Sequence, residues 1–256
     1  MRQLIAFTKK ELYESHANFK AYILLAVFFF FGLFGPLMAM LTPWILEMIA
    51  AADSGIVITL PDPTGLDAWM QFFSNFSQMG MLALVILFAG TTAHELGRGT
   101  LVNLLCKGLK RRTVVFAKFL SAGALWTVAI AVSVLVCFVY TAFFFADAPT
   151  AGLGFAFLMP WLFGLFMIAL LIFGGTLFGN FGGSLGFGLG TFFLLLLLDM
   201  LPHVDRFNPI GLATAALGIL SGAAGGADFA WTIAVCVISI LGLLLGTVFV
   251  FDRKKI

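Results

Sequence analysis

Long runs without Asp, Glu, Lys or Arg dominate this chain and limit what it can fold into. Four of these runs are each long enough for one membrane span: 21–41, 76–93, 119–146 and 229–251. A helix that crosses a hydrocarbon core of about 30 Å needs roughly 20 apolar residues. A fifth run, 148–198, has 51 residues, which predicts two helices. We place the turn between them at residues 179–183, where glycine and asparagine interrupt a helix at little cost.

The composition points to lipid as the solvent. Hydrophobic residues make up 62% of the chain and charged residues only 10%, so a soluble fold would expose large apolar patches. We therefore predict an all-α polytopic membrane protein, residues 1–256 forming a single transmembrane domain with six transmembrane helices. The predicted spans are 21–42, 76–94, 115–146, 153–178, 184–201 and 229–251.

A further uncharged run, 207–227, raises the question of a seventh span. It is less apolar than the others and opens with Asn208-Pro209. With six spans and both termini in the cytoplasm, 13 of the 14 basic residues face the cytoplasm and only Arg206 lies outside, as the positive-inside rule favours. A seventh span would reverse the C-terminal bases. We therefore predict a short outer helix over 209–221, either re-entrant or on the membrane surface.

The first 20 residues predict an interfacial helix. Leu4, Ile5, Thr8 and Leu12 recur at helical spacing, and the charged residues take the other face. An amphipathic helix of this kind lies in the membrane interface. The alternative is the basic region of a cleaved signal peptide, which the length of the following run disfavours.

The chain offers few groups for catalysis. It has no GxxxxGK[ST] phosphate loop, so it does not bind ATP by that route. His94-Glu95 begins like a zinc-protease motif, but Arg98 stands where the second histidine is needed. Asp199, His203 and Asp205 are residue types that hold a cation, but a solvated helix end broken by Pro202 is the favoured explanation.

Other features exclude further classes. The three cysteines are scattered over a loop and two spans, which favours neither disulfides nor a metal cluster. The spans carry no ionisable residue away from their ends, so ion-coupled transport is disfavoured and the driving energy is expected from outside the chain. The basic loop lacks interleaved aromatic residues, so nucleic-acid binding is not expected.

Glycines at four-residue spacing form a possible packing ridge. They fall in two series, Gly175, Gly179 and Gly183, and then Gly182, Gly186 and Gly190. Such spacing lets helix backbones approach closely in lipid. The ridge is interpreted either as a surface that moves during transport or as the ordinary abundance of glycine in membrane helices.

The loop between the second and third spans, 95–113, is the densest charged region. The segment 94–118 holds six of the fourteen basic residues. Gly99 is expected to interrupt the helix that leaves the membrane, Thr100 to cap a short new helix by accepting a backbone N–H bond, and Gly108 to end it in a left-handed conformation. This amphipathic helix can serve as a lever for a cytoplasmic partner. The alternative is that the bases only anchor the loop to anionic headgroups.

The loop carries the pattern E-x-x-x-G-T-L-x-x-L-L. Its residues are Glu95, Gly99, Thr100, Leu101, Leu104 and Leu105, followed by a basic residue and Lys118. With the N-terminal FTKKELYE and six spans, the chain resembles along its whole length the membrane subunits of ABC-2 type transporters, bacterial permeases whose ATPase is a separate chain. It departs from the family pattern at Lys107-Gly108, where members often have a small or polar residue followed by proline.

The resemblance implies a partner-driven exporter in the bacterial plasma membrane. The loop helix would seat in a cleft of the ATPase, two permease copies or two related permeases would form the pathway, and ATP and Mg would be bound by the partner, with no cofactor on this chain. The implied coupling residues are Glu95, Arg98, Gly99, Thr100, Leu101, Leu104, Leu105 and Lys107. If the apolar faces rich in Phe and Gly line the pathway, they favour a lipid-like, peptide or amphipathic drug substrate; the alternative is that these Phe residues face the membrane lipid. A membrane enzyme and a non-transporting anchor or regulatory subunit are the alternatives.

Overall fold

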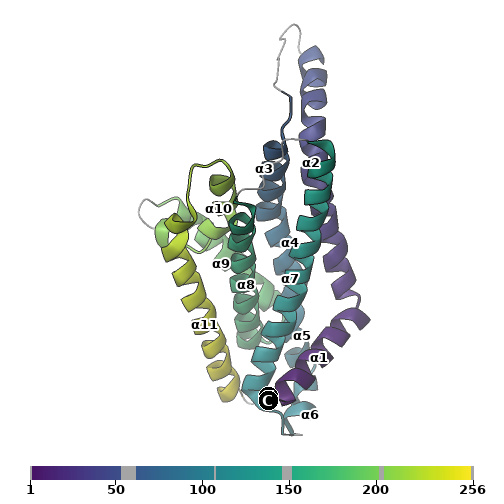
Figure 1. Cartoon of the computed structure of the whole chain (residues 1–256). Helices are drawn as coiled ribbons and strands as arrows, with labels where there is room; N and C mark the ends of the chain where they lie inside the picture. The colour runs from purple at the N-terminus through teal and green to yellow at the C-terminus, as the bar shows by residue number, and fades with distance from the viewer. Residues whose placement is uncertain (1, 53–61, 107, 146–151, 202–204, 255–256) are drawn as a thin grey trace.

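A computed structural model describes residues 2–52, 62–106, 108–145, 152–201 and 205–254. Within these ranges every regular element is a helix. Six of the helices are long and apolar enough to cross a membrane, and they run side by side as an elongated bundle (Figure 1). The predicted fold class is therefore confirmed.

The spanning helices differ in length and continuity. They are α2 (Lys20–Ala52), a rod made of α3 (Gly65–Asn75), η1 (Phe76–Gly80), α4 (Met81–Phe88) and α5 (Gly90–Gly97), then α7 (Arg111–Phe144), α8 (Leu153–Phe178), α9 (Phe181–Asp199) and α11 (Ala230–Arg253). The shorter helices are α1 (Arg2–Ala17), α6 (Thr100–Cys106), η2 (Asp205–Phe207), α10 (Gly211–Leu220) and η3 (Gly226–Phe229).

The second spanning rod begins at Gly65, well before the predicted start at residue 76. Thr64 and Asp67 form a capping box, in which the Thr64 N–H donates to Asp67 Oδ2 at 2.9 Å and the Asp67 N–H donates to Thr64 Oγ1 at 3.3 Å. A carboxylate in the first turn stabilises a helix. Asp67 therefore starts the rod, although in the sequence it lies outside the uncharged run.

The rod contains one π-helical turn, η1, near its middle. Within this turn the Ser77 hydroxyl donates a hydrogen bond to the carbonyl of Ala213 in α10. Short π-helical turns inside longer helices occur often at functional sites. Here the turn joins the second rod to the short helix at the far end of the bundle.

The core is centred on α8. In its most apolar stretch 72% of the residues are buried, against 17% for α9 and 22% for α11. Trp126 of α7 is fully buried, and its indole lies where a side chain at Gly164 of α8 would otherwise project. Phe28 of α2 packs edge-on against Trp126, with ring centroids 5.2 Å apart. The outer helices α2, α9 and α11 leave large apolar faces exposed for lipid or a partner.

The glycine ridge has several roles instead of one. Gly179 is left-handed (φ 71°) and ends α8, and the Asn180 side chain accepts from the Gly183 N–H at 2.6 Å, so the turn lies inside the predicted segment. A Cβ on Gly175 would lie 3.2 Å from the backbone N of Ala93 in α5. By contrast, a Cβ on Gly186 or Gly190 would meet nothing within 4 Å in the described chain.

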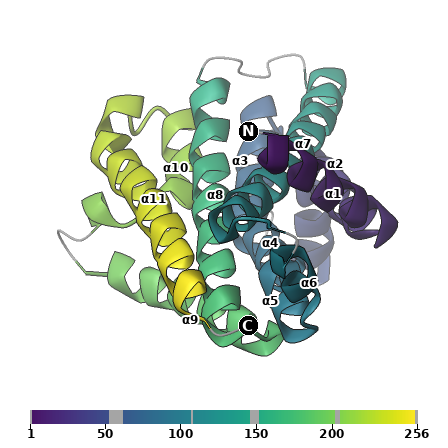
Figure 2. The same cartoon turned by 90° about the horizontal axis from the view of Figure 1, so that it is seen from below.

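The chain places its basic segments at one end. Helices α1 and α6 and the C-terminal end of α11 lie together there, and α10 lies towards the other end (Figures 1 and 2). The Arg111 guanidinium donates to the Lys254 carbonyl at 2.9 Å, and Lys254 Nζ donates to the Thr176 carbonyl at 2.8 Å. These bonds fasten the end of α11 to the start of α7 and to the end of α8. The grouping is the one that the six-span topology requires.

Candidate functional site

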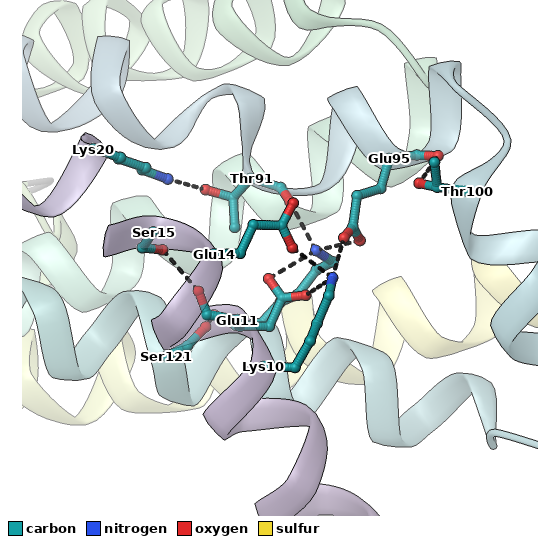
Figure 3. A network of polar contacts seen from close by, with 10 residues as sticks. Lys10, Glu11, Glu14, Ser15, Lys20, Thr91, Glu95, Thr100 and Ser121 are labelled. Atoms are coloured by element: carbon teal, nitrogen blue, oxygen red, sulfur yellow. Dashed lines mark hydrogen bonds and ion pairs between the residues drawn. The ribbon is translucent and has the colours of Figure 1, made fainter. Parts of the chain in front are cut away.

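An ion-pair network joins α1, α5 and α7 at the basic end of the bundle. Lys118 Nζ lies 3.0 Å from Glu11 Oε2 and 2.6 Å from Glu95 Oε2. Lys10 Nζ lies 3.1 Å from Glu11 Oε1, 2.6 Å from Glu14 Oε2 and 2.7 Å from Glu95 Oε1. Figure 3 shows the carboxylates of Glu11, Glu14 and Glu95 around the ammonium group of Lys10. Glu95 is thus shared by both lysines.

The centre of the network is withdrawn from solvent. Lys118 is only 1% exposed and Glu11 8%. Lys118 donates hydrogen bonds to Glu11 and to the Thr91 carbonyl, each at 3.0 Å, and Glu95 is its second counter-ion. A buried charge is tolerated when it is paired and hydrogen-bonded, and removing one partner is strongly destabilising. The network therefore fixes α1 against the spanning helices.

Lys10 lies at the rim of the network, outside the spanning segments. Burial disfavours its charged form, but the carboxylates of Glu14 and Glu95 outweigh that effect and raise the pKa of Lys10 above its ordinary value of 10.5. Lys10 is therefore fully charged at physiological pH and holds the outer edge of the network.

The buried face of α1 differs from the predicted apolar face. Phe7 and Glu11 are its buried residues, while Ile5, on the predicted apolar face, is 68% exposed, as a face turned to the membrane interface would be. This mixed face places Glu11 next to Lys118, which is paired with it at 3.0 Å. The sequence signal that indicates such a partner is the lysine itself, lying several residues inside a spanning helix, where an unpaired charge is costly.

The loop after α5 contains the predicted short helix, α6. Gly99 (φ 68°) and Gly108 (φ 88°) are both left-handed, and they lie on either side of α6, as expected for glycine at helix ends. For Thr100 the structure describes a hydrogen bond that the sequence did not predict. Thr100 is the first residue of α6, and its hydroxyl donates to the Glu95 carbonyl at 3.3 Å, across the turn made by Gly99.

The residues implied for coupling are divided between the interior and the surface. Leu101 is fully buried in the chain's own core, and Leu105 packs against that core. An amphipathic helix buries its leucines against the nearest apolar surface, which here is the bundle. Arg98 and Thr100 are exposed. Lys107 and the side chain of Leu104 lie outside the described residues.

Basic and thiol groups complete the exposed surface around α6. Cys106 is exposed, whereas Cys137 and Cys236 are buried. Lys110 and Arg112, which follow α6, are also exposed. The described part of this surface is therefore polar and basic, and we call the set Arg98, Thr100, Cys106, Lys110 and Arg112 the loop surface.

Two groups of residues in this chain could hold a cation. Ligand oxygens of Glu11, Glu14 and Glu95 lie within 4.8 Å of one another, but Lys10 and Lys118 already serve as their counter-ions. The second group, predicted from the sequence, is Asp199, His203 and Asp205, and Asn208 Nδ2 donates to Asp199 at 3.2 Å. In that set His203 and the side chain of Asp205 lie outside the described residues.

Comparison with known proteins gives two matches over nearly the full length. Residues 6–256 match the family described as ABC-2 family transporter protein. The chain is also similar to the uncharacterized transmembrane protein YxlG of Bacillus subtilis (strain 168), with 21% identity over 256 residues, covering 100% of this chain and 99% of the relative.

Proposed function

The chain belongs to the ABC-2 family of transporter proteins, and from that premise we propose that it is the membrane-spanning permease subunit of a bacterial exporter. In this proposal a separate ATPase binds ATP and Mg, and this chain forms part of the translocation pathway. The sequence supports the division of labour because it carries no phosphate loop of its own.

The loop surface is the proposed contact with the ATPase. It lies at the end of the second rod, and α6 is fixed to the bundle by buried Leu101 and by the Thr100–Glu95 hydrogen bond. Glu95 is in turn paired with Lys10 of α1 and Lys118 of α7. A push on the loop surface would therefore move the second span, the third span and α1 together. This connection is the observation that carries the proposal.

The proposal assigns Glu95 and Leu101 a different role from direct contact. Both face the chain's own interior, so they transmit movement, and Arg98 and Thr100 touch the partner. The termini and the loop would lie in the cytoplasm, since their bases share one end of the bundle. A second permease copy or a related permease would cover exposed apolar faces such as that of α9, where Gly186 and Gly190 lie in open space.

Cys106 provides a direct test of the contact. It is the exposed one of the three cysteines, so a short bifunctional thiol–amine cross-linker in membranes containing the complete transporter should join it to the ATPase. A matched control places a cysteine at the other end of the bundle, in the double variant Cys106→Ser/Arg206→Cys. Arg206 is exposed and lies at that opposite end.

The expected result is a cross-link to an ATP-binding protein from Cys106 and none from the control. A membrane-impermeant maleimide should also label Cys106 in inverted vesicles and not in intact cells. Labelling of Cys106 from outside the cell would contradict the topology. Absence of any cross-link, with the ATPase present in the same membranes, would contradict the proposed contact.

A further inference from the structure

A cavity of about 470 Å³ opens beside the ion-pair network, between α1, the start of α2, α5 and α7. Its volume falls in the range of ordinary ligand sites, about 300–1,000 Å³. One part of its wall is the network itself. Another part is apolar and includes Ile86, Leu87 and Leu125. The cavity therefore joins a charged region to the apolar surface of the spanning helices.

Lys20 lines this cavity, and its ammonium group has hydrogen-bond donors that no described residue uses. Its Nζ donates to Thr91 Oγ1 at 2.9 Å and lies 4.4 Å from the centroid of the Phe88 ring, contacts that Figure 3 shows in part. An ammonium group has three donors, and Lys20 uses one of them on the described residues. No carboxylate in the described part of the chain forms an ion pair with it.

Arg98 lines the same cavity and is exposed. No hydrogen bond or ion pair joins its guanidinium to another described residue. The nearby carboxylates of Glu11, Glu14 and Glu95 are already shared by Lys10 and Lys118. The cavity wall thus holds two cations without a carboxylate partner, of which Arg presents a planar fork suited to phosphate and Lys a point charge.

We propose that this cavity binds the phosphate of an amphiphile, held between Lys20 and Arg98. The apolar wall at Ile86 and Leu125 would receive the start of an acyl chain, which fits a phospholipid of the leaflet on whose side α1 lies. Ile86 is 54% exposed, so the path from the cavity to the bilayer is open at that residue. Arg98 is also a loop-surface residue, but the proposal is argued from the cavity and its charges, and its test uses this chain without an ATPase, so its failure can be told from failure of the proposed function.

Native mass spectrometry of the full chain in mild detergent tests the site. The probes are phosphatidylglycerol, diacylglycerol with the same chains, and inorganic phosphate as a competitor. The variants are Lys20→Gln and Arg98→Gln, with Lys9→Gln as the matched control because Lys9 is exposed on α1 and does not line the cavity. Arg98 is exposed and its guanidinium is not bonded to another described residue, so its variant tests the site even if Lys20→Gln unfolds.

We expect phosphatidylglycerol to bind wild type and Lys9→Gln equally, and each cavity variant to bind about tenfold less, as loss of one charge-assisted hydrogen bond predicts. Diacylglycerol should not bind at this site. Displacement of the lipid by millimolar inorganic phosphate would identify the free anion as the occupant and keep the assigned residues. Equal lipid binding by Arg98→Gln and Lys9→Gln would overturn the proposal.

Discussion

Replacing Lys118 with methionine tests the idea that one buried ammonium holds α1 in place. Met is close to Lys in length, so the change mainly removes the charge. Glu11 and Glu95 then depend on Lys10 alone, and the Thr91 carbonyl loses its donor. The remaining site has three carboxylates and one ammonium group.

The expected cost follows from the burial of the pair. Lys118 is 1% exposed, and the side chains of Glu11 and Glu95 are 9% and 13% exposed. Removing one partner of a buried ion pair costs about 3–5 kcal/mol. Since about 1.4 kcal/mol is a factor of ten in an equilibrium constant, the docked state of α1 should become about a hundredfold to a few thousandfold less favoured.

Hydrogen exchange of the α1 amides in detergent measures this change directly. We expect residues 2–17 of the Lys118→Met variant to lose protection, while the amides of α8 keep theirs. Lys9→Met is the control, because it removes an exposed charge from the same helix. In the double variant Lys118→Met/Glu95→Gln part of the protection should return, with a coupling energy of about 0.5–3 kcal/mol.

The reasoning is refuted if Lys118→Met and Lys9→Met give the same exchange in α1. It is also refuted if protection is lost equally in α8, since the whole bundle would then be unfolding. The double variant separates the pair interaction from a general packing defect, because Glu95→Gln removes one of the two carboxylates that lost Lys118 and leaves the size of the side chain unchanged.

Three further expectations concern packing, a buried amide and pH. Gly175→Leu should destabilise the protein by about 1–3 kcal/mol, because the new side chain meets the α5 backbone. Gly186→Leu places its side chain in open space and should leave the thermal stability of the isolated chain unchanged. Equal losses of stability in the two variants would contradict the packing assigned to Gly175. Asn208→Ala should lower stability by about 1–3 kcal/mol per buried group left unpaired, because Asn208 is 3% exposed and donates to the Leu195 carbonyl at 2.8 Å. The control is Asn18→Ala, at an exposed asparagine, and equal melting temperatures of the two variants would contradict the prediction. The pKa of Lys10 is raised above 10.5 in the folded protein, so its contribution to the docking of α1 is complete below the ordinary lysine pKa and is lost only as pH rises through the folded pKa. The rate at which a protease cleaves α1, corrected for the protease's own pH dependence, should therefore be constant from about pH 6 to 9. A rise in cleavage within that window would argue against this role of Lys10.

Local signals in the sequence determined the scaffold of this protein. Uncharged runs indicated six spanning helices, because lipid excludes charge and a span has a fixed minimum length. Glycine positions indicated the turn after α8 and the two ends of α6, since Gly99, Gly108 and Gly179 adopt left-handed conformations that other residues avoid. These features depend on a few neighbouring residues and the solvent, so they can be read without knowing how the helices pack.

Only the tertiary structure decided what the charged and apolar groups of the loop face. Glu95 and Leu101 belong to one sequence motif, yet Glu95 pairs with Lys10 and Lys118, and Leu101 enters the core. The Lys118–Glu11 pair joins residues 107 positions apart. Such a pair forms because α1 folds back against α7, and the spacing of residues along the chain does not contain that approach.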